Sequence, residues 1–155
     1  MSRGLRVALI PLVLLVTGCA AIRQVAPYPS AGIKGVDIES VSLSALTVRF
    51  DIEVKNPYGT DLPLVGVGYK LFTEGKLFVE GESEASATIP ASSKRVVPVD
   101  IRVPYQSMID AGRIVRPGAK IPYEAELALK VNAPVIGTIT VPLDRDSGTL
   151  KVPVF

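Results

Sequence analysis

The stretch LTVRFDIEVKNP, residues 46–57, decides the fold of this chain. Its apolar residues alternate with polar or charged ones. Because successive side chains of a β-strand point to opposite faces of the sheet, this period of two predicts a strand with one buried and one wet face. The charges on the wet face alternate in sign, so they can pair with side chains of neighbouring strands. Asn56-Pro57 ends the strand, since proline has no N–H to donate to a sheet. The alternating apolar residues are Val48, Phe50, Ile52 and Val54.

Further short strands are expected along the chain, separated by turns that use its 13 prolines and 13 glycines. Pro98 lies inside one of these strands, which predicts an edge strand or a bulge. Residues 73–76, Thr-Glu-Gly-Lys, have the composition of a hairpin turn. Residues 105–116 carry apolar residues at helical spacing and predict a short helix that Pro117-Gly118 ends. The other expected strands are 36–44, 64–72, 77–82, 94–103, 121–131, 136–143 and 148–154, with 83–89 leading into a loop at 90–93.

Seven to nine short strands with one inserted helix indicate an all-β protein, an antiparallel β-sandwich. The 155 residues suffice for one domain. Hydrophobic residues make up 48% of the chain and charged residues 21%, a composition that argues against disorder. A domain of this size buries roughly two thirds of its unfolded surface, so it needs neither disulfides nor a metal to fold.

The first 18 residues have the layout of a secretory signal peptide. Arg3 and Arg6 form a basic start, residues 7–16 form an apolar segment, and small residues follow before the expected cleavage point. About ten apolar residues are too few to cross a hydrocarbon core of ~30 Å comfortably. We therefore expect a signal peptide at 1–18, a tether at 19–34 and the domain at 35–155.

The end of this segment, LVTGC at residues 15–19, resembles a bacterial lipobox. The resemblance implies that the Cys19 sulfur receives a diacylglycerol and that the chain is cut before it. An ordinary signal peptide with an incidental cysteine, or a buried structural cysteine, is the alternative. Ala20 follows the cysteine, which by the same resemblance indicates an outer membrane, facing the periplasm, if the cell is Gram-negative.

The charge of the chain limits its partners. The net charge of +2 comes from Arg3 and Arg6, and the remaining basic and acidic side chains balance. A neutral domain lacks the electrostatic footprint that nucleic acid binding needs. The expected partners are instead a membrane, reached through the lipid anchor, and proteins of the cell envelope.

The ends of the predicted strands carry residues in a distinctive order. Asn56-Pro57 closes the alternating strand, and Leu62-Pro63-Leu64 opens the next. With the residues named below, they resemble the late embryogenesis abundant type 2 family, also called the water stress and hypersensitive response domain, over residues 35–154. Tyr58 departs from the pattern, since the family often repeats asparagine there. The other matching residues are Tyr69, Glu74-Gly75, Gly81, Ile89-Pro90-Ala91, Val97-Pro98-Val99, Pro104-Tyr105, Gly137 to Pro142 and Gly148 to Pro153.

The resemblance implies an immunoglobulin- or fibronectin III-like sandwich with one helix, and a role in stress or desiccation tolerance. The motif also has a physical interpretation. Asn56 can cap the strand end through its side chain, and Pro57 fixes the direction in which the chain leaves. Pro63 keeps the start of the next strand extended. These residues either shape a corner of the sandwich or belong to a loop that contacts a ligand.

Candidates for catalysis or metal binding are few. The chain has no histidine, which excludes Ser-His-Asp and Cys-His catalytic arrangements. The carboxylate pairs Asp51/Glu53 and Glu124/Glu126 have a spacing of about 7 Å that could serve glycoside hydrolysis. They are interleaved with lysine and arginine, however, so a solvated face is the favoured interpretation.

Two further polar clusters have alternative interpretations. The segment 144–148, DRDSG, is partly similar to a calcium loop but lacks the later glutamate, so a turn is favoured. Arg113, Arg116 and Lys120 suit the carboxyl end of the predicted helix, or else contact lipid headgroups. We predict no catalytic residue, no metal and no cofactor. The predicted function is non-enzymatic protection by a membrane-anchored protein, with a specific binding or assembly module of the cell envelope as the alternative.

Overall fold

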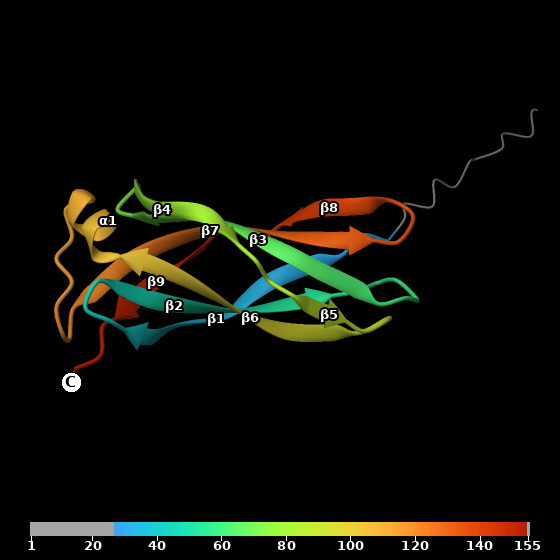
Figure 1. The fold of residues 1–155 in the computed structure, drawn as a ribbon, viewed down its shortest axis with the longest axis horizontal. Coiled ribbons are helices and arrows are strands. Elements are labelled where there is room, and N and C mark those ends of the chain that lie inside the picture. The colour runs from blue at the N-terminus through green and yellow to red at the C-terminus, as the bar shows by residue number, and fades with distance from the viewer. Residues whose placement is uncertain (1–26, 155) are drawn as a thin grey trace, which may run out of the picture.

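Two antiparallel sheets pack face to face in the computed structural model, which describes residues 27–154 (Figure 1). The smaller sheet has the strand order β1-β2-β6. The larger one has the order β4-β3-β7-β8, with β5 beside β3 and β9 beside β7. This arrangement confirms the predicted antiparallel sandwich with one short helix. The elements are β1 (Ser30–Val41), β2 (Ala45–Lys55), β3 (Leu62–Thr73), β4 (Lys76–Ser83), β5 (Ala87–Ile89), β6 (Lys94–Pro104), α1 (Tyr105–Asp110), β7 (Lys120–Ala133), β8 (Gly137–Pro142) and β9 (Asp146–Lys151).

The core lies between the sheets and is built mainly from β2 and β7. All four apolar residues that alternate along β2 are buried, as predicted, and those of β7 face them from the other sheet. Phe50 of β2 meets Tyr123 of β7 edge to face, with ring centroids 6.4 Å apart. The alternation of β7 is buried at Ile121, Tyr123, Ala125, Leu127, Leu129, Val131 and Ala133.

The wet face of β2 pairs its charges with those of β1 and β6, as predicted. Arg49 lies 2.8 Å from Glu39 of β1 and 2.8 Å from Asp100 of β6. Glu53 lies 3.4 Å from Lys34 and 3.6 Å from Lys94 in the same two strands. The hydrogen bond from Arg49 to Asp100 raises the pKa of the guanidinium. Opposite charges thus bridge all three strands of the smaller sheet.

Strand β1 begins earlier than predicted, so the expected tether at 19–34 is wrong for residues 30–34. Ser30 is already opposite Lys55 of β2. The pairing register shifts between Ile33 and Gly35 and again between Ile38 and Ser40. Each shift exchanges the faces to which the following side chains point, so a search for period two does not find this strand.

Helix α1 is also shorter than the predicted 105–116. It covers Tyr105–Asp110, and the N–H groups of Gly112 and Arg113 then bond back to the carbonyls of Ile109 and Met108. Gly112 has φ +83°, a left-handed conformation that ends helices. Met108 is buried. The helical spacing therefore identified an inward-facing residue but not the end of the helix.

Two local predictions are confirmed. The hairpin turn between β3 and β4 places Glu74 at φ +49° and Gly75 at φ +76°, the positive angles that a tight two-residue hairpin requires. Pro98 lies in β6, which forms an edge of the three-stranded sheet. Its missing N–H therefore interrupts no pairing inside the sheet.

Candidate functional site

The corner between β2 and β3 is held by the buried side chain of Asn56. Its Nδ2 donates hydrogen bonds to the carbonyls of Thr60 at 2.8 Å, Ile89 at 3.0 Å and Pro90 at 3.1 Å. Its Oδ1 accepts the N–H of Tyr58 at 2.9 Å. We call this arrangement the Asn56 clasp. It ties the loop after β2 to the loop after β5, although the two are more than 30 residues apart in the chain.

The remaining motif residues complete the same corner. Leu62 and Leu64 point into the core and are almost fully buried. Pro63 lies between them, exposed, and is opposite Thr88 of β5. Backbone groups of the protein use both the donors and the acceptor of the Asn56 amide. The geometry therefore favours the corner-shaping interpretation over a loop that contacts a ligand.

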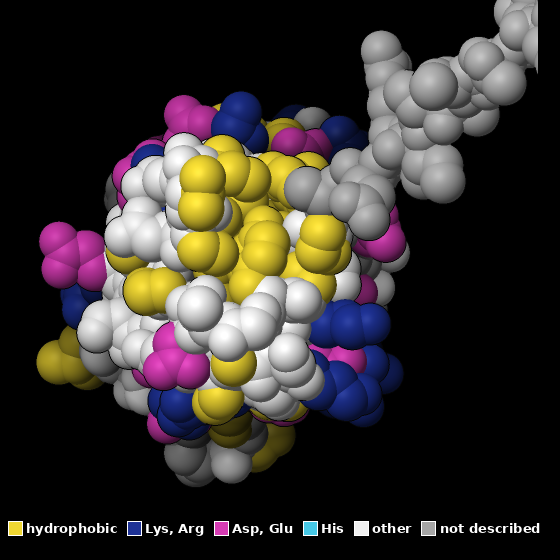
Figure 2. Space-filling view, turned by 90° about the vertical axis from the view of Figure 1, so that its right-hand side faces the viewer, with side chains coloured by type: hydrophobic (Ala, Val, Ile, Leu, Met, Phe, Trp, Pro, Cys, Tyr) yellow, Lys and Arg dark blue, Asp and Glu magenta, His cyan; other side chains and the backbone are white. Residues whose placement is uncertain are grey.

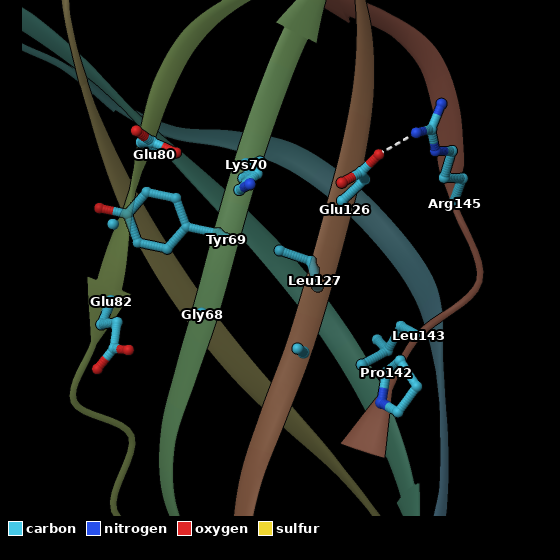
Figure 3. Close-up of a pocket in the computed structure, with 12 residues that line it drawn as sticks. Gly68, Tyr69, Lys70, Glu80, Glu82, Glu126, Leu127, Pro142, Leu143 and Arg145 are labelled. Atoms are coloured by element: carbon cyan, nitrogen blue, oxygen red, sulfur yellow. Dashed lines mark ion pairs between the residues drawn. The ribbon is translucent and has the colours of Figure 1, made fainter. Parts of the chain in front are cut away.

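An open groove of about 610 Å³ crosses the larger sheet over β4, β3 and β7 (Figure 3). Gly68 and Ala128 are cross-strand neighbours in its floor, and charged side chains stand around it. Glu126, which belongs to the predicted carboxylate pair Glu124/Glu126, forms an ion pair with Arg145. Glu82 forms another with Lys130. These carboxylates neutralise cations of the same chain, an arrangement that suits charge pairing across strands more than acid–base chemistry.

Metal binding has equally little support in the described part of the chain. Between residues 27 and 154, no three acidic or cysteine side chains converge on a common point. Asp146 of the DRDSG segment accepts a hydrogen bond from the Tyr123 hydroxyl at 2.7 Å. Burial and this hydrogen bond raise the pKa of Tyr123 above its ordinary value. The predicted turn at 144–148 is shorter than expected, because β9 already begins at Asp146 and only Asp144 and Arg145 of the segment lie in the connection.

Two of the matching glycines lie beneath tyrosine rings. Tyr69 is opposite Gly81, and a Cβ added at Gly81 would lie 2.8 Å from the tyrosine hydroxyl. Figure 3 shows the Tyr69 ring extending from β3 toward β4. Tyr123 covers Gly148 in the same way, with a Cβ there 3.0 Å from the ring. A Cβ at either position would force the tyrosine ring to shift, so glycine suits the close approach of both rings.

The basic cluster after α1 does not have the predicted place. The helix ends at Asp110 and has no basic residue in its last turn, so the interpretation of Arg113, Arg116 and Lys120 as helix-end cations is wrong. Arg113 forms an ion pair with Glu74 at the tip of the β3–β4 hairpin. The pair joins the loop after α1 to the larger sheet.

The end of the sandwich where the described chain begins has exposed apolar side chains that the sequence analysis missed (Figure 2). Val135 and Ile136, in the turn between β7 and β8, are 107% and 58% exposed. We call these two residues the apolar tip. The signal that could have revealed them is a three-residue turn, Pro134 to Ile136, made of apolar residues where polar ones are usual.

The opposite end also exposes apolar side chains. Leu43, in the turn between β1 and β2, is 105% exposed, and Ile114 is 75% exposed. Beside Leu43 lies a groove of about 650 Å³ whose walls include Val41, Tyr105 and Pro153. We call this region the far end, and the end with the apolar tip the near end.

The predicted lipidation residue, Cys19, lies outside the described residues, as does the signal peptide. Within residues 27–154, no helix has the length and hydropathy needed to cross a membrane.

Comparison with known proteins gives consistent results. A family model described as late embryogenesis abundant protein matches residues 51–147. The desiccation-related protein PCC27-45 of Craterostigma plantagineum is 30% identical over 125 residues, which cover 81% of this chain and 82% of that protein. The desiccation protectant protein Lea14 homolog of Glycine max is 29% identical over 129 residues, covering 83% and 84%.

Solved structures resemble the chain in fold. The solution structure of AT1g01470 from Arabidopsis thaliana has a TM-score of 0.65 at 24% identity and covers 83% of this chain and 85% of that one. A crystal structure of a protein from Archaeoglobus fulgidus has a TM-score of 0.59 at 11% identity, covering 79% and 99%.

Proposed function

The chain belongs to the late embryogenesis abundant family, and from this membership we propose that it protects proteins or membranes of its surroundings against water loss. The observation that carries the proposal is the family match over residues 51–147, together with relatives that are named for desiccation. Protection would be non-enzymatic. It would act through weak contacts of low specificity, which is compatible with the paired surface charges of both sheets.

The proposal includes a lipid anchor at Cys19, in a bacterial cell envelope. The support is the sequence of the first 19 residues, with its basic start, apolar segment and lipobox-like end. Two or three acyl chains, at ~0.8 kcal/mol per buried methylene, hold a protein stably on a bilayer, whereas one does not. By the same resemblance, Ala20 favours an outer membrane, facing the periplasm, in a Gram-negative cell.

The start of β1 makes the proposed tether short. Only seven residues separate Cys19 from Pro27, where the described chain begins. Fully extended, the eight steps between these two residues span at most about 29 Å. An anchor at Cys19 would therefore keep the domain close to the membrane, where its local concentration favours weak contacts.

Mass spectrometry of the protein from its native membrane tests the anchor. We expect loss of residues 1–18 and added acyl mass on Cys19. An unmodified Cys19, or a retained leader, would rule the anchor out. Protection is tested separately, by drying and rewetting cells that have the chain, lack it, or contain the Cys19→Ser variant. We expect envelope integrity to fall when the chain is absent, and unchanged integrity would contradict the protective role.

The far end supports a second candidate, a specific binding module of the envelope. Leu43 is fully exposed beside an apolar groove, a surface that suits a protein partner. Crosslinking in the native envelope separates the two candidates. One stoichiometric neighbour, lost in a Leu43→Asp variant, would support the binding module, whereas a diffuse set of neighbours unaffected by Leu43→Asp would support protection.

A further inference from the structure

We propose that the apolar tip, Val135 and Ile136, inserts into the lipid surface that holds Cys19, so that the sandwich stands with its near end on the membrane. This inference rests on the lipid anchor proposed above. It adds a second contact, made by the folded domain itself, which would fix the orientation that a lipid tether alone leaves free.

The backbone of the tip shows that folding does not account for Val135. Its φ of +68° is left-handed, a conformation that a β-branched residue adopts only with strain. Its side chain is 107% exposed, so no packing within the domain compensates for that strain. Glycine or asparagine would suit the turn better. A β-branched residue at a positive φ, with an apolar side chain exposed to solvent, points to a contact outside the folded chain.

The tip lies at the end from which the proposed tether leaves. Ser30, at the start of β1, is opposite Lys55, while Ala133 and Gly137 flank the tip at the ends of β7 and β8. Figure 1 places the start of β1 and the β7–β8 turn at the same end of the molecule. Tyr28, just before β1, has its hydroxyl 3.4 Å from the carbonyl of Thr140 in β8. The chain therefore enters the domain beside the hairpin that carries the tip.

Distances separate the near end from the far end as candidates for membrane contact. The tether reaches at most about 29 Å from Pro27. The far end is separated from the near end by the length of the strands, and the 14 residues of β7 alone extend roughly 45 Å. If the sandwich stood on its far end, the tether would therefore be too short to reach the bilayer. Only the near end remains within reach of the bilayer while the sandwich stands upright.

The charges at the near end suit a lipid headgroup layer. Lys55 and Lys94 are neighbours at the ends of β2 and β6, at the near end, and both are exposed. Glu53 lies two residues before Lys55 on the same face of β2 and is 3.6 Å from Lys94. Asp61 accepts a hydrogen bond from the N–H of Ala91. Exposed apolar side chains and exposed lysines at the same end of a domain are an arrangement by which surface-bound proteins contact both acyl chains and phosphates.

The test uses the full lipidated chain in vesicles of phosphatidylethanolamine and phosphatidylglycerol. A thiol-reactive, environment-sensitive dye is attached in the variants Val135→Cys and Leu43→Cys. Quenching by nitroxide-labelled lipids then reports contact with the bilayer. We expect the probe at position 135 to be quenched at least threefold more strongly than the matched probe at position 43. Equal quenching at the two positions would overturn the proposed contact.

The wild-type chain distinguishes this failure from failure of the anchor. Its single cysteine is Cys19, so an acylated sulfur leaves it unlabelled, and dye on the wild type would show that the anchor is absent.

A second experiment places the dye outside the tip, so that the tip residues can be substituted without moving the probe. With the dye at Asn132→Cys, the double substitution Val135→Asp, Ile136→Asp should reduce quenching at least twofold, whereas Leu43→Asp should leave it unchanged. Unaltered quenching in the double variant would also overturn the proposal.

Discussion

The two ends of the sandwich are closed by opposite means. The near end is held by the Asn56 clasp, a buried amide with four hydrogen bonds to backbone groups. The far end is closed by α1, whose buried residue is Met108. One end is closed by directed hydrogen bonds, and the other is closed by a buried apolar side chain.

The difference follows from what each end must satisfy. At the near end the loop after β2 meets the end of β5, and carbonyl groups that are buried or half-buried there need donors. Asn56 supplies them to Ile89 and Pro90. At the far end the chain forms a helical turn that satisfies its own backbone, so the space beneath needs only an apolar side chain. A buried polar residue is thus required where loops cross, and it is dispensable where a helix covers the core.

The sharpest way to break this contrast is Asn56→Leu. The leucine fills a similar volume but leaves the N–H of Tyr58 and the carbonyl of Ile89 without a partner. We expect the free energy of unfolding to fall by about 3 to 5 kcal/mol, measured by urea denaturation. Ser93→Ala, which removes an exposed hydrogen bond to Pro90 in the same loop, should cost no more than about 1 kcal/mol. Equal losses in the two variants would show that the clasp has no special role.

At the far end, Met108→Ala should cost about 2 to 4 kcal/mol, because it leaves a cavity beneath α1. Met108→Leu should cost less than about 1.5 kcal/mol, since it conserves volume. The ability of an apolar substitute to restore stability at Met108, but not at Asn56, is the direct measure of the contrast. Thermal unfolding of the three variants checks it, and a Met108→Leu protein as unstable as Met108→Ala would contradict it.

A pH titration sharpens the comparison, because a buried tyrosine in the far half of the core is hydrogen-bonded to a half-buried carboxylate. Burial and the Asp146 carboxylate raise the pKa of Tyr123 in the folded chain. The unfolded chain therefore loses this proton first, at about pH 10, and stability falls as the pH rises further. Tyr123→Phe should cost about 1 kcal/mol at neutral pH. The difference between the two proteins should then shrink above about pH 10, and a difference that stays constant would contradict the expectation.

The smallest expected effect is a gain, at the apolar tip. Val135→Gly relieves the left-handed conformation at φ +68° and should raise the free energy of unfolding by about 0.5 to 1 kcal/mol. Leu43→Gly, at an equally exposed turn of the far end whose φ is not positive, should give no gain. Chemical denaturation of both variants checks the difference, and a loss of stability in Val135→Gly would show that the valine is not strained.

Regular alternation made much of this fold predictable. In β2 and β7 every second residue faces the core, so the alternation in each sequence identified both the strand and the face that is buried. β1 could not be placed correctly, because two register shifts break its alternation. The length of α1 was overestimated because apolar residues at helical spacing continue into the loop that follows Gly112.

The corner and the tip show where prediction from sequence ends. Asn56 was identified as a residue that could cap its strand. Its partners Ile89 and Pro90 could not be, because they become neighbours only through the packing of β5 beside β3. The signal at Val135 was limited to an apolar residue in a turn, since neither its exposure nor its backbone angle follows from periodicity. Local rules predict strands and turns, whereas contacts between distant loops require the assembled structure.

The place of Pro98 in β6 has a consequence for a protein proposed to act as water is withdrawn. Drying concentrates every macromolecule, and an unguarded strand edge then offers a template on which a second chain can add, the first step toward fibrils. Along β6, the missing N–H of Pro98 and the charged Arg95 and Arg102 oppose such growth. The β6 edge can therefore lie close to copies of the protein without pairing with them.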